Sequence, residues 1–291
     1  MRIGTRASPL ALAQAQTVAD LFEDGELVPI VTTGDRERSS GDKERWVKEL
    51  ELALLAGEID LAVHSAKDVP SLLPDHLELV GAPSRGEPLD ALVGAASLTG
   101  LPEGARVGTA SVRRAAQLRA LRQDLDIVEI RGNVDTRLRK LADGEVDALV
   151  LAAAGLLRLG READIGCILS DLVPCAGQGT LVLEGRTDND EARGAVREIT
   201  DTATWVTLRA ERRLVMGLDA SCNTPLGAHA TIGEEGIVLR TFVGLPDGSA
   251  WLRDETPPMA TPNQAGELAA ERLLSAGAAD LLRRAEELAA R

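Results

Sequence analysis

Residues 106–114 read Arg106-Val107-Gly108-Thr109-Ala110-Ser111-Val112-Arg113-Arg114, a short apolar run that meets small residues and then a helical pattern. The same order recurs after the apolar run 127–130, in Ile130-Arg131-Gly132-Asn133-Val134-Asp135-Thr136-Arg137. Strand, tight junction and helix in succession are typical of α/β folds, and such alternation fills the first two-thirds of the chain. We therefore expect an α/β fold with mainly parallel sheets.

Segments on both sides extend this pattern. We expect a strand at Arg2–Arg6, followed by a helix that Ser8 caps and that begins at Pro9. Further strands are expected at 27–33, 60–65, 77–82, 90–94 and 181–184, with a helix at 46–56. From about residue 201 the pattern changes to a helix, then antiparallel strands joined by a hairpin at Pro246-Asp247-Gly248-Ser249, then one long closing helix.

The region around the two junctions is positively charged. From residue 106 to residue 161, eleven basic residues stand against seven acidic ones, a local net charge of +4 in a chain whose total is −14. Such a reversal indicates a site that attracts anions. Arginines beside free backbone N–H groups at helix N-termini are suited to hold carboxylates or phosphates. The alternative, an ordinary solvated helix face, fits three of these arginines: Arg119, Arg122 and Arg139.

Composition argues against several classes of protein. With 291 residues the chain has room for two or three domains. Its start lacks the pattern of a signal peptide, and no apolar run reaches membrane-spanning length. Three cysteines without metal-ligand spacing and three scattered histidines argue against a disulfide scaffold or a zinc site, and favour a reducing cytoplasm. The acidic total argues against nucleic acid or an anionic membrane as a partner.

Four motifs at the ends of expected strands or in loops could carry chemistry. His64-Ser65-Ala66-Lys67-Asp68-Val69-Pro70 sets a carboxylate beside an ammonium where open α/β sheets bind ligands, although alone it would be an ordinary turn. Arg6 precedes the capping Ser8, and Arg158 follows an apolar strand. Cys222 lies in a small, polar, proline-stopped loop. A lone cysteine is usually a buried small hydrophobe, so Cys222 gains weight only from its context.

Together these motifs resemble those of one enzyme family, hydroxymethylbilane synthase, also called porphobilinogen deaminase, of tetrapyrrole biosynthesis. Eight segments match in family order along essentially the whole chain. They are Thr5–Leu10, Lys48-Glu49-Leu50-Glu51, His64–Pro70, Gly108–Arg114, Ile130–Leu138, Ala154–Leu159, Gly177-Gln178-Gly179 and the loop around Cys222.

The resemblance implies a transferase that joins four porphobilinogen molecules head to tail, releases ammonia at each step, and hydrolyses off linear hydroxymethylbilane for porphyrin and heme biosynthesis. It implies a dipyrromethane cofactor, made from the same substrate and bound by a thioether to Cys222. Each pyrrole ring brings two carboxylates, which accounts for an arginine-lined site. Loss of ammonia leaves a delocalised cation that a fixed carboxylate can stabilise.

The resemblance also implies roles for individual residues. The catalytic residue is Asp68. The cofactor-binding residues are Cys222, Lys67, Asp68, Ser111, Arg113, Arg114 and Arg137. The substrate-binding residues are Arg6, Ser8, Arg131, Arg137 and Arg158. A lid loop contains Lys43, Trp46 and Lys48, and its Asp42-Lys43-Glu44-Arg45-Trp46 departs from the Gly-Lys-Gly-Leu-Phe usual in the family. Ala220-Ser221 likewise replace a frequent Gly-Gly before the cysteine.

The architecture that the resemblance implies has three domains. Two are similar α/β domains of the solute-binding-protein kind (periplasmic binding protein type II), and a smaller C-terminal α/β domain carries Cys222. The expected boundaries are 1–86 with 175–199, then 87–174, then 200–291. We expect a cytoplasmic monomer without metal, nucleic acid or membrane partners, with handover of product to uroporphyrinogen-III synthase as a further option.

Two alternatives to this enzyme stay open. A non-catalytic anion receptor of the two-lobed type would share the arginine-lined site and would not need Cys222, but it would carry a secretion signal and lack a third domain. An inactive relative could bind tetrapyrroles for regulation. Retention of Asp68 and Lys67 with the arginine set favours the enzyme.

Overall fold

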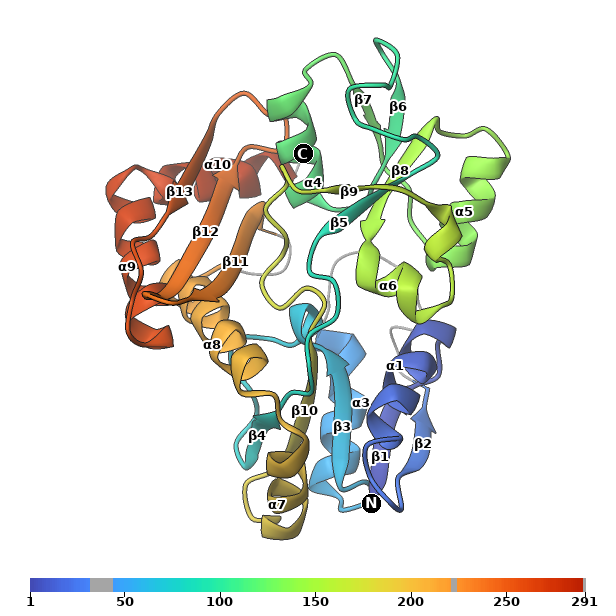
Figure 1. The fold of residues 1–291 in the computed structure, drawn as a ribbon, viewed down its shortest axis with the longest axis vertical. Helices are drawn as coiled ribbons and strands as arrows, with labels where there is room; N and C mark the ends of the chain where they lie inside the picture. Colours follow the sequence, from blue (N-terminus) through green and yellow to red (C-terminus); the bar gives the residue numbers. More distant parts are fainter. Residues whose placement is uncertain (32–43, 221–223, 290–291) are drawn as a thin grey trace. The chain divides into compact units, whose positions relative to one another are not determined.

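A computed structural model describes the chain except for residues 32–43, 221–223 and 290–291 (Figure 1). The chain divides into two compact units. The first consists of Met1–Gly86 and Gly179–Leu208, and the second of Glu87–Gln178 and Arg209–Arg291. The three-domain division with its boundaries stays a prediction.

The first unit is built on a five-stranded sheet in the order β2-β1-β3-β10-β4. Its strands are β1 (Arg2–Arg6), β2 (Glu26–Ile30), β3 (Leu61–Ser65), β4 (Leu77–Gly81) and β10 (Leu181–Arg186). Strand β1 is parallel to both β2 and β3, whereas β10 is antiparallel to both β3 and β4. The strand predicted at Arg2–Arg6 is confirmed to the residue.

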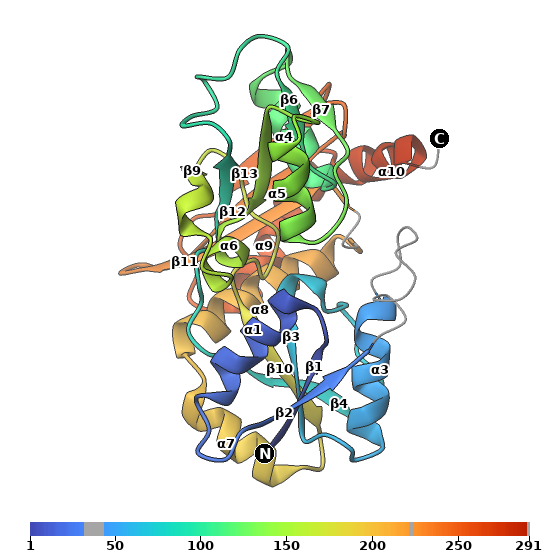
Figure 2. The same ribbon diagram turned by 90° about the vertical axis from the view of Figure 1, so that its right-hand side faces the viewer.

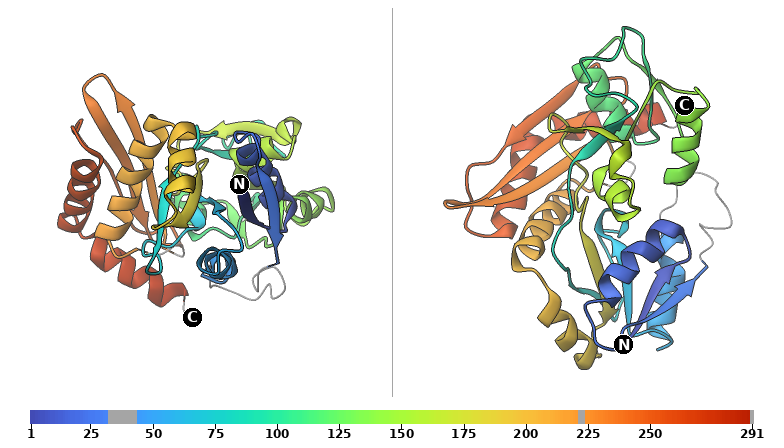
Figure 3. Two further views of the ribbon diagram at one scale, coloured as in Figure 1. Left: turned by 90° about the horizontal axis from the view of Figure 1, so that it is seen from below. Right: turned by 45° about the vertical axis from the view of Figure 1, so that its right-hand side comes forward.

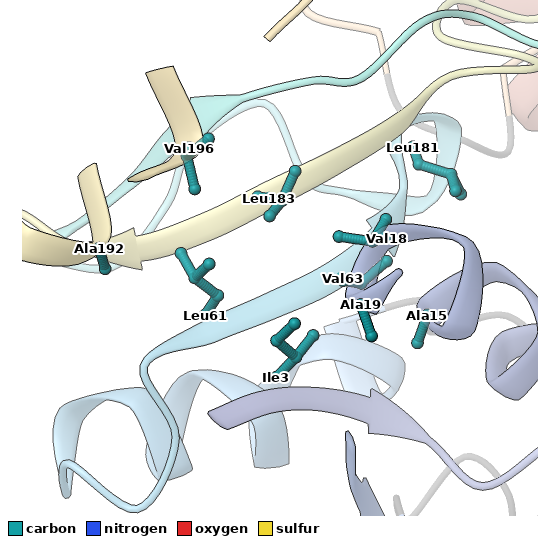
Figure 4. Packing of buried hydrophobic residues seen from close by; sticks show 10 residues of the cluster. All are labelled: Ile3, Ala15, Val18, Ala19, Leu61, Val63, Leu181, Leu183, Ala192 and Val196. Carbon is teal, nitrogen blue, oxygen red and sulfur yellow. The ribbon is translucent and has the colours of Figure 1, made fainter. Parts of the chain in front are cut away.

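Helices cover both faces of this sheet, as Figure 2 shows. On one face, α1 (Pro9–Ala19) and α7 (Asp190–Ile199) pack on alternate strand residues such as Leu61 and Leu183 (Figure 4). On the other face, α3 (Glu44–Leu55) packs through Leu50 and Leu54 on Ala62. The two-residue period of a strand thus gives the sheet two apolar faces, each buried by helix. Helix α8 (Thr202–Gly217) runs through the boundary between the units.

The second unit contains a five-stranded sheet with the same pattern, in the order β7-β6-β8-β5-β9. Its strands are β5 (Asp90–Val93), β6 (Arg106–Gly108), β7 (Asp126–Val128), β8 (Ala148–Ala152) and β9 (Ile165–Leu169). Helix α4 (Val112–Leu121) packs on one face through Leu118, and α5 (Val134–Ala142) and α6 (Ala153–Arg158) pack on the other. Strand β6 is parallel to its neighbours, and β5 is antiparallel to its neighbours.

The expectation of an α/β fold with mainly parallel sheets is confirmed, because four of the five strands in each large sheet run in the same direction. The one exception in each sheet is the strand next to an edge strand, β10 beside β4 in the first sheet and β5 beside β9 in the second. These are the strands that border the two stretches of chain joining the sheets, and neither strand arrives through a β-helix-β crossover. The pairing of such strands is not restricted to the parallel arrangement that a crossover helix imposes.

A smaller antiparallel sheet completes the second unit. It consists of β11 (Leu226–Gly233), β12 (Gly236–Gly244) and β13 (Trp251–Glu255), so the hairpin predicted after Pro246 is confirmed. The single closing helix is wrong: α9 (Pro262–Ser275) and α10 (Ala278–Ala289) are separate, because Gly277 takes a φ of +98° that ends α9. Both helices pack along this sheet (Figure 3). Its Phe242 contacts Ala116 of α4.

Among the residues that the structure describes, none of the helices combines the length and the apolar composition that crossing a bilayer requires.

Candidate functional site

In the first unit, the predicted site residues gather at the carboxyl ends of neighbouring parallel strands. Arg6 is the last residue of β1, and Lys67 and Asp68 follow β3, which pairs directly with β1. Ser8 caps α1, since its hydroxyl accepts a hydrogen bond from the Ala11 N–H at 3.3 Å. This is the edge at which open α/β sheets bind ligands.

A single 3-10 turn, η1 (Ala66–Asp68), presents Lys67 and Asp68. Both side chains are half-buried, and the residues on either side of them are anchored. Ala66 is buried and its N–H donates to the Thr180 carbonyl at 3.0 Å, while Val69 is buried in the same apolar cluster. The turn therefore holds a carboxylate and an ammonium on a rigid support, which is what a preorganised polar site needs.

Beneath this turn lies a buried ionisable pair that the sequence analysis did not find. His64 Nε2 on β3 lies 2.9 Å from Glu184 Oε2 on β10, and the side chains are 4% and 0% exposed. Burying a carboxylate without a partner is costly, and the imidazole of His64 offsets that cost for Glu184. His64 belongs to a motif that the sequence analysis noted, but no local signal points to a partner 120 residues away.

In the second unit, Ser111 caps α4 and accepts a hydrogen bond from the Arg114 N–H at 3.4 Å. The two consecutive arginines of this helix turn inward rather than outward. Arg113 and Arg114 are 3% and 6% exposed, and both meet the fully buried carboxylate of Asp90 on β5. The predicted helix-terminal arginines are therefore present, with an internal counter-charge that the sequence did not reveal.

The electrostatics of Asp90 follow from this contact. Burial by itself would raise the pKa of Asp90, but the charges and hydrogen bonds of Arg113 and Arg114 outweigh burial and hold that pKa far below its ordinary value. Gln178 donates a further hydrogen bond from Nε2 to Asp90 Oδ1 at 2.8 Å. Asp90 is thus an ionised carboxylate with four neighbouring donor contacts, and sequence reasoning missed it because it reads as a strand residue.

Arg137, on α5, is a partly buried cation. Its Nε donates to the Gly132 carbonyl at 2.8 Å, and no carboxylate in the described part of the chain pairs with it. Burial, followed by the charge of Arg114, lowers the pKa of Arg137 to about 10. The guanidinium is still charged at neutral pH, but it is poorly solvated, and an added carboxylate would stabilise it.

The other predicted arginines differ in their surroundings. Arg131 is exposed and pairs with Glu129, with Nη2 2.7 Å from Oε1. Arg158 ends α6, and burial lowers its pKa. The solvated-face prediction holds for the exposed Arg139 and is wrong for Arg119, whose Nη1 donates to the Pro246 carbonyl at 2.7 Å. It is also wrong for Arg122, which donates to the Leu98 carbonyl at 2.9 Å, because both side chains satisfy carbonyls of neighbouring loops.

Some predicted residues lie outside the described part of the chain. Cys222 and Lys43 fall in the two internal gaps, and the side chain of Trp46 is not described, although its backbone belongs to α3. Lys48 is described and is exposed on α3. The described cysteines, Cys167 and Cys175, are free thiols. No group of three or more metal-ligating side chains occurs within the described ranges.

Comparison with known proteins places these sites in a family. Residues 1–194 match the family model "Porphobilinogen deaminase, dipyromethane cofactor binding domain", and residues 205–275 match "Porphobilinogen deaminase, C-terminal domain". The chain is 43% identical to porphobilinogen deaminase of Roseiflexus sp. strain RS-1, over 96% of this chain and 97% of that protein. It is 44% identical to porphobilinogen deaminase of Deinococcus radiodurans, over 98% of each.

Likeness to solved structures is weaker. The crystal structure of the methionine binding protein MetQ aligns with a TM-score of 0.44 and 19% identity, over 68% of this chain and 87% of that one, which supports no conclusion about this chain. The two family models together leave only the segment 195–204 and the C-terminal residues after 275 unmatched. On the strength of those models and of relatives matched over nearly their full length, this chain belongs to the porphobilinogen deaminase family.

Proposed function

We propose that this chain is a hydroxymethylbilane synthase, which joins four porphobilinogen molecules head to tail with loss of ammonia and releases linear hydroxymethylbilane by hydrolysis. The observation that carries the proposal is the family membership, because the matched region includes the strand-end motifs of both five-stranded sheets. The buried arginines are consistent with it, since every pyrrole ring of this substrate brings two carboxylates.

The residues present fit a dipyrromethane cofactor. A carboxylate-bearing group needs cations that are already desolvated and fixed, and Arg137 is a poorly solvated guanidinium with only a backbone carbonyl as its hydrogen-bond partner in the described chain. When bound, the cofactor supplies the carbon nucleophile that primes the chain, and the protein supplies position and field. The proposed holding residues are Cys222 through a thioether, with Lys67, Asp68, Ser111, Arg113, Arg114 and Arg137.

Asp68 is the proposed catalytic residue. Departure of ammonia leaves positive charge on the substrate ring, and a carboxylate fixed by the anchored η1 turn stabilises that charge without first having to reorganise. The same carboxylate can accept hydrogen bonds from pyrrole N–H groups. The proposed substrate-binding residues, which hold acetate and propionate groups, are Arg6, Ser8, Arg131, Arg137 and Arg158.

The remaining parts of the proposal concern the whole protein. The chain forms three domains, with boundaries at 1–86 with 175–199, 87–174 and 200–291, and Cys222 lies in the third. The proposed lid comprises Lys43 with Trp46 and Lys48, and the last two belong to helix α3 rather than to the loop that the sequence predicted. The protein works as a cytoplasmic monomer, with product passing to uroporphyrinogen-III synthase.

Intact mass of the freshly purified protein, with peptide mapping, tests the proposal. A mass excess of two pyrrole units on the peptide that contains Cys222, present in wild type and in Cys175→Ser but absent from Cys222→Ser, is the expected result. Cys175 is a matched control because it is a free, partly buried thiol. If wild type stays unmodified after incubation with porphobilinogen and forms no product, the anion-receptor or inactive-relative alternative replaces the enzyme.

A further inference from the structure

Asp90 contacts two of the proposed cofactor-binding arginines but has itself no role in the proposed function. Its side chain is fully buried on β5 and meets the guanidiniums of two consecutive residues of α4. Arg114 donates from Nε at 3.0 Å and from Nη2 at 2.8 Å to Oδ1, and Arg113 Nη1 lies 2.8 Å from Oδ2. One carboxylate therefore engages both arginines, one through each oxygen.

The two guanidiniums also make hydrogen bonds to groups other than Asp90. Arg114 Nη1 donates to the Val150 carbonyl at 3.1 Å. Arg113 Nη1 donates to the Val173 carbonyl at 2.7 Å, and its Nη2 donates to Gln178 Oε1 at 3.4 Å. A guanidinium has five N–H donors. Arg114 makes three contacts within the protein, and Arg113 makes three when its approach to Asp90 Oδ2 is included, so each guanidinium is fixed in direction and has two N–H donors outside these contacts.

The charges show why Asp90 has this effect. Two adjacent buried cations repel each other strongly in a medium of low dielectric constant. With one carboxylate between them, the three side chains keep a net charge of +1. The positive charge of Arg114 also acts on Arg137 and, after burial, is the second cause of its lowered pKa. Asp90 thus allows two cations to remain side by side in a fixed orientation near a third.

We infer that Asp90 is a positioning residue, which orients the free donors of Arg113 and Arg114 toward a carboxylate of the bound ligand. The inference rests on the proposed function and deepens it, because it names what sets the geometry of the arginine pair. It predicts that loss of the carboxylate lets the guanidiniums separate, so that a carboxylated pyrrole is captured more slowly even in a protein that remains folded.

The experiment compares Asp90→Asn with Asp147→Asn. The control removes an Asp–Arg pair of the same unit that is exposed, with Arg106 Nη2 2.8 Å from Asp147 Oδ1. Unloaded protein is incubated with porphobilinogen, and the rate of cofactor loading is followed by intact mass. Folding is checked by thermal unfolding, and the Nε–Hε signal of Arg114 is followed by ¹H–¹⁵N NMR. The loading rate and the NMR signal report on the orientation of the Arg113 and Arg114 guanidiniums. If Asp90 only stabilised the fold, neither would change in a variant that remains folded.

The expected result is a folded Asp90→Asn that loads about tenfold or more slowly, since small misplacements of positioning groups have effects of that size. It should also lose the exchange-protected Arg114 signal, while Asp147→Asn behaves as wild type. Wild-type loading by folded Asp90→Asn overturns the inference. If Asp90→Asn does not fold, Asp90→Glu, which keeps the charge but moves it by one methylene, decides in the same way: wild-type loading overturns the inference and slowed loading supports it.

Failure of the proposed function gives a different result. In that case wild type itself does not load, whatever the state of Asp90. The Arg114 Nε–Hε signal then decides the question alone. Loss of this signal in Asp90→Asn supports the inference that Asp90 positions the arginines, and retention of the signal overturns that inference.

Discussion

Replacing Arg137 by methionine should stabilise the unloaded protein while it weakens ligand capture. Burial and the charge of Arg114 lower the pKa of Arg137 from its ordinary value to about 10. Since each pKa unit corresponds to about 1.4 kcal/mol, the charged side chain destabilises the folded state by about 3 kcal/mol. Loss of the hydrogen bond to the Gly132 carbonyl offsets about 1 kcal/mol of the gain. The net expectation is about 2 kcal/mol, or roughly 4–8 °C in Tm for a unit of this size.

The dependence on pH has a definite sign. A basic group whose folded pKa is lowered binds fewer protons in the folded than in the unfolded state between its folded pKa, about 10 here, and its higher unfolded pKa, so its penalty disappears only as the pH rises through that window. Below pH 10 the penalty is fully present. The stability difference between Arg137→Met and wild type should therefore be constant from pH 6 to pH 9.

The assay is chemical and thermal denaturation of both proteins in a Cys222→Ser background, which keeps them unloaded. Arg139→Met is the matched control, because Arg139 is exposed on the same helix, and its stability should stay within about 0.5 kcal/mol of the parent. In the Cys222 background, Arg137→Met should raise the KM for porphobilinogen by about tenfold or more, as loss of a charge-assisted contact does. An Arg137→Met protein that is less stable than its parent would refute the argument that no carboxylate among the described residues pairs with this guanidinium.

Three more predictions concern the first unit. Asp68→Asn should lower kcat by about 100-fold or more with Tm nearly unchanged, because it removes a fixed charge at a half-buried turn. Glu184→Ala should lower the free energy of unfolding by about 3–5 kcal/mol in urea titrations, because it leaves His64 buried without its partner. Asp60 has its pKa lowered, chiefly by the hydrogen bond from Arg2, so it stabilises the fold above its unfolded pKa and loses that effect as the pH falls through its folded pKa. Asp60→Asn should therefore flatten the loss of stability between pH 5 and pH 2, by less than about 1 kcal/mol.

Each of these has a control on an exposed residue of the same unit. Asp75→Asn should keep wild-type kcat, and an equally active Asp68→Asn would remove Asp68 from the mechanism. Glu58→Ala should change stability by less than about 0.5 kcal/mol, and a similarly mild Glu184→Ala would show that the buried pair contributes little. Asp24→Asn should leave the loss of stability between pH 5 and pH 2 unchanged. If Asp60→Asn shows the same loss as wild type, the lowered pKa of Asp60 does not contribute to acid stability.

Local patterns were read correctly where a few adjacent residues decide the conformation. Ser8 caps α1 with Pro9 at its first position, and Ser111 caps α4, because a short side-chain oxygen satisfies N–H groups only two or three residues ahead. The strand at Arg2–Arg6 followed from its composition and from the junction after it. The placement of Lys67 and Asp68 beyond a strand end was likewise predictable, since a run of apolar residues stopped by polar ones and proline marks that end.

The predictions that are wrong concern residues whose conformation depends on distant or unspecific signals. The composition predicts one continuous closing helix, because alanine, leucine and glutamate favour helix on both sides of Gly277 and a single glycine is tolerated in many helices. In the sequence, Arg119 and Arg122 fit the solvated face of a helix. Their partners are carbonyls of loops that only the folded chain brings close.

The sequence by itself determined the α/β class, the helix caps, the strand-end motifs and, through their order, the family. Only the tertiary structure decided what the charged residues of those motifs touch. Asp90 lies 24 residues from Arg114 and Glu184 lies 120 residues from His64, and each looks like an ordinary strand residue. A cap or a turn is satisfied by neighbours along the chain, whereas a buried charge is satisfied by whatever group the packing of strands and helices sets against it.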